Sequence, residues 1–104
     1  MMGSNQQSIL MPPQQSNVFN TRQFSHKGNS YDISAYTKPT DPYMVFVDVA
    51  QGGNPVIYTY PDGFQAKQEH CVELTTAFDL YKMRGINAVT ALMDDAEEQV
   101  KRWV

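Results

Sequence analysis

Cysteine and histidine, the two residue types best suited to nucleophilic and proton-transfer chemistry, meet at one place in the chain. Cys71 is the only cysteine, and His70 directly precedes it. The surrounding sequence predicts a helix, in which neighbouring side chains point about 100° apart, so the imidazole would not reach the thiol. We therefore expect a buried structural cysteine beside a surface histidine rather than a catalytic dyad.

The other candidates for metal binding or acid–base chemistry are isolated from one another. His26 has no second ligand at a zinc-binding spacing. Asp94 and Asp95 are adjacent rather than three or four residues apart, so their carboxylates do not converge on one ion. Gly52 and Gly53 follow a predicted strand but lack the glycine–lysine pattern of phosphate loops. We expect no metal, no cofactor, no small-molecule substrate and no enzymatic activity.

Composition and charge argue against two more classes of ligand. The chain has 8 basic and 11 acidic residues, and its basic residues are scattered singly. Nucleic-acid binding draws on clustered Lys and Arg, so nucleic acid is not expected as the main ligand. No apolar run approaches the roughly 18 residues of a membrane span, and no secretory signal is apparent. We expect synthesis in the cytosol and no membrane association.

The first 42 residues differ in character from the rest. They are rich in Gln, Asn, Ser and Pro, and four prolines interrupt any regular apolar period. We predict an extended low-complexity arm over residues 1–42, followed by a small domain over residues 43–104. By itself such an arm buries too little apolar surface to offset its ordering entropy, so a partner would have to order it.

Single apolar side chains recur along this arm. They suit an arm that wraps a partner and places one side chain in each pocket, because buried anchors dominate binding energy. The candidate partner-binding residues are Ile9, Leu10, Met11, Phe19, Phe24, Tyr31 and Tyr36. For the two tyrosines, which lie close to the first predicted strand, packing against the chain's own strands is an equal alternative.

The sequence after residue 42 predicts strands first. The runs YMVFVDVA and PVIYTY, joined by QGGN, indicate an antiparallel hairpin over residues 43–60. Its first strand is apolar on both faces, which favours burial on both sides. Asp62 and Gly63 indicate a tight turn, after which residues 64–69 either return as a third strand or lead into a helix.

Two helices are predicted at the C-terminus. Apolar residues recur every three or four positions over residues 71–81, and Gly85 suits the end of that helix. Asn87 suits the N-cap of a second helix that extends to residue 103. The short link predicts an antiparallel helix pair. The side chains expected to be buried are Leu74, Phe78, Leu92 and Val100.

Together these patterns predict an α+β fold with a protein-binding role. The predicted order is an extended irregular N-terminal arm, a two- or three-stranded antiparallel hairpin or meander, and an antiparallel pair of helices. A long arm with single anchors suits tethering to neighbouring protein subunits, which can be present in many copies in an assembly. We expect a non-catalytic structural or accessory component of a large assembly, most commonly a virus or phage particle (capsid or tail). The alternative is a small acidic regulator that inhibits one cellular enzyme.

Overall fold

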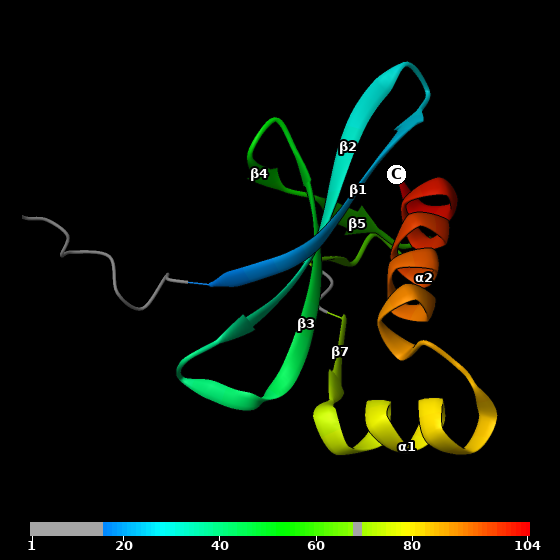
Figure 1. Ribbon diagram of the computed structural model, residues 1–104. Helices are drawn as coiled ribbons and strands as arrows, with labels where there is room; N and C mark the ends of the chain where they lie inside the picture. The colour runs from blue at the N-terminus through cyan, green and yellow to red at the C-terminus, as the bar shows by residue number, and fades with distance from the viewer. Residues whose placement is uncertain (1–15, 68–69) are drawn as a thin grey trace, which may run out of the picture.

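A strongly twisted antiparallel sheet and two C-terminal helices make up the structure (Figure 1). The computed structural model describes residues 16–67 and 70–104. The sheet contains β1 (Asn17–His26), β2 (Asn29–Lys38), β3 (Asp41–Gln51), β4 (Asn54–Pro55) and β7 (His70–Glu73). The helices are α1 (Leu74–Arg84) and α2 (Ala88–Trp103). The predicted α+β class, with an antiparallel meander followed by two helices, is confirmed.

Strands β1 and β2 lie in a segment for which the sequence predicted no regular structure. They pair antiparallel along almost their whole length and are joined by Lys27 and Gly28, both with positive φ (53° and 81°). The prediction of an irregular arm is therefore wrong for residues 17–38. Most side chains of β1 are exposed and polar, so β1 is ordered by backbone hydrogen bonds to β2. Such backbone pairing cannot be predicted from amino-acid composition.

The core lies between the sheet and α2. On β2 the buried apolar residues alternate, because every second side chain faces the helix. The buried side chains of this core from β2, β3 and α2 are Tyr31, Ile33, Ala35, Val47, Val49, Met93, Ala96 and Val100. Since β2 supplies three of them, residues before position 43 share one core with those after it.

The hairpin predicted over residues 43–60 is present only in its first part. Gly52 and Gly53 form its turn with φ angles of 58° and 84°, which favour glycine, and β4 pairs with the end of β3. The chain then leaves this sheet, and β5 (Ile57–Thr59) pairs with β6 (Gln65–Lys67) in a separate ribbon. Of the two alternatives for residues 64–69, a strand is observed over residues 65–67.

Strand β7 occupies the start of the predicted first helix. It pairs antiparallel with β3, from Val47 opposite His70 to Met44 opposite Glu73, and the helix begins only at residue 74. His70 is buried and Cys71 is exposed, the reverse of the prediction. The reason is the strand: consecutive side chains point to opposite faces of the sheet, and the face that carries His70 meets α2.

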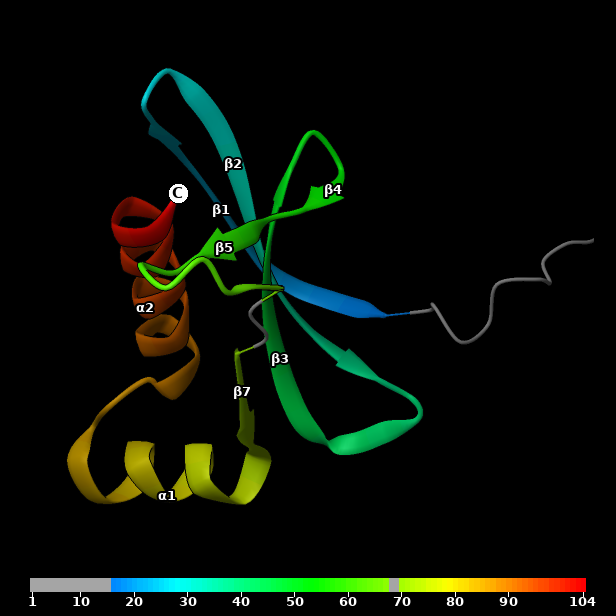
Figure 2. The ribbon, with the colours of Figure 1, turned by 180° about the vertical axis from the view of Figure 1, so that it is seen from behind.

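The two helices do not lie side by side. Figures 1 and 2 show α1 lying across the end of α2, whose length runs along the sheet. Gly85, with φ 66°, ends α1, and the Asn87 side chain accepts a hydrogen bond from the backbone N–H of Thr90 at 3.1 Å. Both predicted caps are confirmed. The predicted antiparallel packing of the pair is wrong, because the sheet occupies the apolar face of α2.

Burial follows from this arrangement. Val100 is fully buried as predicted, and Leu92 packs partly buried against the core. Leu74 and Phe78 are 42% and 62% exposed, so their predicted burial is wrong. Their expected packing partner was α2, which contacts the sheet instead.

Candidate protein-binding surface

Helix α1 presents a line of large apolar side chains to solvent. Leu74, Phe78 and Tyr81 occupy positions i, i+4 and i+7, which fall on one side of a helix. Phe78 and Tyr81 are 62% and 66% exposed, and no residue of α1 is buried. We call these three residues the α1 stripe.

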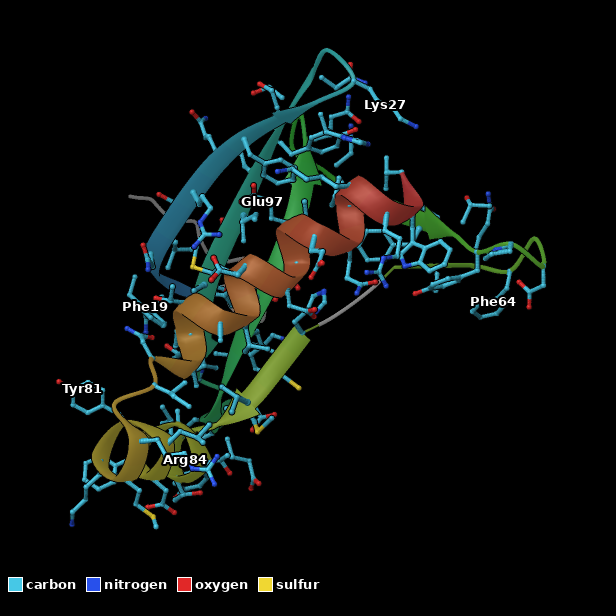
Figure 3. All side chains as sticks on the ribbon, turned by 90° about the vertical axis from the view of Figure 1, so that its right-hand side faces the viewer. Phe19, Lys27, Phe64, Tyr81, Arg84 and Glu97 are labelled. Atoms are coloured by element: carbon cyan, nitrogen blue, oxygen red, sulfur yellow. The ribbon has the colours of Figure 1, made fainter. Side chains whose placement is uncertain are left out.

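The position of α1 follows from its attachment to β7. Glu73, the last residue of β7, pairs with Met44 of β3, so the helix starts at the end of the sheet and leaves it. Only Ala77 and Leu80, on one edge of the helix, are partly buried. The stripe lies beside that edge and turns outward, and Figure 3 shows Tyr81 pointing away from the body of the molecule.

Two further apolar residues are exposed near the α1 stripe. Met83, near the end of α1, is 79% exposed, but nine residues of helix separate it from Leu74, so it lies on the opposite side of α1. Tyr43 is 76% exposed. Tyr43 precedes Met44, the residue paired with Glu73, so it lies at the same end of the sheet as the start of α1. Exposed apolar side chains that line up on one face, as they do in the α1 stripe, are typical of protein interaction sites.

A shallow apolar groove lies next to α1. Its volume is about 270 Å³, and it opens between β7, α1 and α2. Its lining is mainly apolar and consists of Cys71, Val72, Leu80, Ile86, Ala88, Ala91, Leu92 and Asp95. Small-molecule sites are usually deeper and about 300–1,000 Å³ in volume. A groove of this size and openness suits a single apolar side chain of a protein partner.

The acidic side of α2 is largely paired within the chain. Arg22 of β1 donates to Asp94 at 2.7 Å and to Glu97 at 3.3 Å, and Lys101 lies 2.9 Å from Glu97. Hydrogen bonds from Lys101 and Arg22 lower the pKa of Glu97. The hydrogen bond to Asp94 raises the pKa of Arg22. These contacts tie β1 to α2 and reduce the acidic charge that α2 presents to a partner.

The histidines and the cysteine are dispersed. The Nδ1 atom of His70 lies 3.4 Å from an oxygen of Asp95, while Cys71 belongs to the opposite face of β7. His26 lies against the ring of Tyr31, with 6.5 Å between the ring centroids. Within residues 16–67 and 70–104, no three His, Cys, Asp or Glu side chains form a group that could hold a metal ion.

The predicted arm anchors fall in different environments. Ile9, Leu10 and Met11 lie outside the described residues. Phe19 is 54% exposed at an irregularity in the pairing of β1 with β2. Phe24 is half-buried and stacks on Tyr31, with ring centroids 5.3 Å apart.

The two tyrosines of the predicted set belong to the interior. Tyr31 is 2% exposed in the core, and Tyr36 is 8% exposed and donates a hydrogen bond to Asp48 at 2.6 Å. The alternative left open for them, packing against the chain's own strands, is the one observed. Among the predicted anchors described, only Phe19 is mostly exposed.

Sequence reasoning identified the residues of the α1 stripe but assigned them to the core. Their helical spacing was the available signal, and it has the same form for a stripe that packs inside a chain and one that packs against a partner. No protein-family model matches the chain, and no curated protein or solved structure matches it. Neither described helix is both long enough and apolar enough to cross a membrane.

Proposed function

We propose that this protein is a non-catalytic component of a multi-subunit assembly and that it binds a protein partner through the α1 stripe. One observation carries the proposal: an 11-residue helix with three large apolar side chains in line has no buried residue. In most surface helices the apolar stripe faces the core of the same chain. Here it faces outward, and the described residues of the chain leave it exposed.

Covering the stripe would contribute favourable free energy to docking. A fully exposed aromatic side chain offers about 150–250 Å² of surface, so Phe78 and Tyr81 each leave on the order of 100 Å² or more exposed. At about 25 cal/mol per Å², burying each ring contributes roughly 2–3 kcal/mol before the cost of association. Two adjacent aromatic rings are also typical of interface hot spots.

A second contact at the other edge of the sheet fits an assembly role. Phe19 is exposed on β1, and Ile9, Leu10 and Met11 precede it in the chain. Two separate contacts let one small chain bridge two neighbouring subunits, and linked contacts raise the overall affinity. A virus or phage particle, built from repeated subunits, is the setting we propose for this bridging.

The alternative, an acidic regulator that mimics charge, has less support. A charge mimic presents unpaired carboxylates to its target, whereas Asp94 and Glu97 are already paired with Arg22. The apolar α1 stripe is the stronger candidate for contact with a partner.

The test is incorporation of the full-length chain into large particles in the cells that produce it. Tagged wild-type protein should sediment with large particles in a density gradient. The double variant Phe78→Ser, Tyr81→Ser should move to the light fractions while its melting temperature stays close to that of the wild type, because neither side chain is buried.

A matched control substitutes exposed residues on another side of the same helix. Thr75→Ala with Thr76→Ala should incorporate like the wild type. Normal incorporation of the Phe78 and Tyr81 double variant would refute the α1 stripe as the docking surface. A wild-type protein found only in one small, discrete complex would favour the regulator instead.

A further inference from the structure

One antiparallel register would place the α1 stripes of two copies directly against each other. Leu74 and Tyr81 are equally far from the midpoint between Ala77 and Phe78, about 5 Å along the axis on either side. If a second α1 lies antiparallel across the stripe, Leu74 of each copy faces Tyr81 of the other. Phe78 then faces its own counterpart close to the two-fold axis.

We propose that the α1 stripe binds a second copy of this chain, with the two α1 helices antiparallel around a two-fold axis. This inference rests on the proposed function and identifies the partner of the same surface. Such an interface uses one patch on both subunits, so the patch must be complementary to itself. The three stripe side chains are all large and apolar, so each copy can cover the stripe of the other.

Charge favours the antiparallel orientation. Glu73 and Asp79 balance Lys82 and Arg84, so the helix and its N-cap carry no net charge and two copies do not repel each other. The acidic Glu73 stands at the start, and both basic residues lie in the last turn. Antiparallel pairing brings the basic end of one helix beside the acidic start of the other, and it also aligns the helix dipoles favourably.

The placement of α1 leaves room for this contact. Figures 1 and 2 show the helix at one end of the molecule, clear of the β5–β6 ribbon and of the β1–β2 hairpin. It is 11 residues long, about 16 Å, so in the register that places Leu74 opposite Tyr81 two such helices overlap along most of their length.

The exposed area of the α1 stripe indicates how tightly two copies should bind each other. The exposed parts of its three side chains amount to about 300–400 Å² per copy. A standard stable interface buries about 800 Å² per partner. The pairing should therefore be weak and depend on concentration, with a dissociation constant in the micromolar range or above. In an assembly that holds many copies, the local concentration would be high enough for it to form.

The first experiment measures the mass of the purified full-length chain by sedimentation equilibrium. The mass should rise from that of a monomer, 11.8 kDa, towards twice that value between about 1 µM and about 1 mM protein. Phe78→Ser should raise the dissociation constant at least tenfold, whereas the control Thr75→Ala with Thr76→Ala, which changes no charge, should leave it within about twofold.

The second experiment tests orientation by disulfide trapping, with Cys71→Ser as the background because the native thiol is exposed. Leu74→Cys and Tyr81→Cys chains are prepared separately and oxidised alone or mixed. The mixture should form cross-linked dimers, whereas each chain alone should not. In an antiparallel pair, two identical positions at 74 or at 81 lie about 10 Å apart along the axis, too far for a disulfide.

The outcomes separate this inference from the proposed function. Cross-linking of each variant with itself would overturn the antiparallel arrangement. If the chain stays monomeric at all concentrations while the Phe78 and Tyr81 double variant still loses incorporation, self-association is refuted and the proposed function stands with a different protein as partner. If the chain forms the trapped dimer but never enters a large particle, self-association stands and the proposed assembly role is refuted.

Discussion

Helices α1 and α2 have similar compositions but opposite environments. About half of the residues in each are apolar, and each has basic residues in its last turn. Yet α2 buries Ala88, Met93, Ala96 and Val100 against the sheet, and α1 buries nothing. The difference shows that a helix can form in this chain for two purposes, one to close the core and one to present a surface.

Polar contacts reinforce the difference. Asn87 caps the start of α2, and Arg22 joins its middle to β1. The side chain of Lys27 donates to the backbone oxygen of Val104, just beyond the end of α2. The N-cap residue of α1, Glu73, makes no side-chain capping hydrogen bond. Substitutions in α2 should therefore act on stability, and substitutions in the α1 stripe should act on association.

The largest effect should come from opening the core beneath α2. Met93 is 1% exposed, so Met93→Ala should lower the free energy of unfolding by about 2–5 kcal/mol. That is a large part of the roughly 5–15 kcal/mol typical of a folded protein. Urea denaturation followed by circular dichroism measures the loss. An unchanged midpoint would show that α2 does not close the core.

A second effect on stability should appear at high pH, in the core that α2 covers. The pKa of Tyr58 is raised from 10.0 to about 12, mainly because its side chain is buried. The folded state therefore favours the neutral phenol of Tyr58. The stability that the neutral phenol contributes is complete below pH 10, and it is lost as the pH rises from 10 through 12. The loss should be on the order of 2 kcal/mol at the end of that range.

The control for this effect is Tyr58→Phe, which removes the titrating group and keeps the ring. Its free energy of unfolding should change less between pH 10 and pH 12 than that of the wild type. Identical pH profiles for the two proteins would mean that another group causes the alkaline loss.

A smaller effect is expected where β1 meets α2. Contacts with Lys101 and Arg22 lower the pKa of Glu97 below its usual 4.5, so its carboxylate stabilises the fold at neutral pH and loses that effect as the pH falls through the acid range. Glu97→Gln should cost about 0.5–1 kcal/mol at pH 7, and the difference from wild type should shrink in acid. Thermal melts at several pH values measure it.

The next residue, Glu98, provides the matched control for Glu97. Glu98 is paired only loosely with Arg102, at 3.7 Å, and its side chain is mostly exposed. Glu98→Gln should therefore change stability less than Glu97→Gln at pH 7. Equal losses of stability for both variants would show that the contact with Arg22 adds no stability beyond that of the Glu97–Lys101 ion pair within α2.

The smallest effect on stability should come from the α1 stripe. The sequence pattern alone predicts that Phe78→Ala costs about 3–5 kcal/mol, as for a core residue. Because Phe78 is 62% exposed, the structure predicts a change within about 0.5 kcal/mol for the chain as a monomer. Dilute-protein melts decide between the two values, and a loss above about 2 kcal/mol would place Phe78 in the core.

Local signals in the sequence predicted much of the fold correctly. Strand β3, the turn at Gly52 and Gly53, the end of α1 at Gly85 and the Asn87 cap of α2 all follow from residues within a few positions of one another. The α1 stripe was likewise visible as a helical period. Residues close in the chain meet whatever the rest of the molecule does, so their types alone determine such features.

Only the tertiary structure decided how the remaining segments were used. The polar β1 and the short β7 are strands because β2 and β3 offer them backbone partners, although β7 resembles the start of a helix. The α1 stripe is exposed because α2 lies on the sheet rather than on α1. The sequence by itself determined where the apolar side chains lie on each helix. Which helix covers the core depends on contacts between residues far apart in the chain, and a local period does not contain that information.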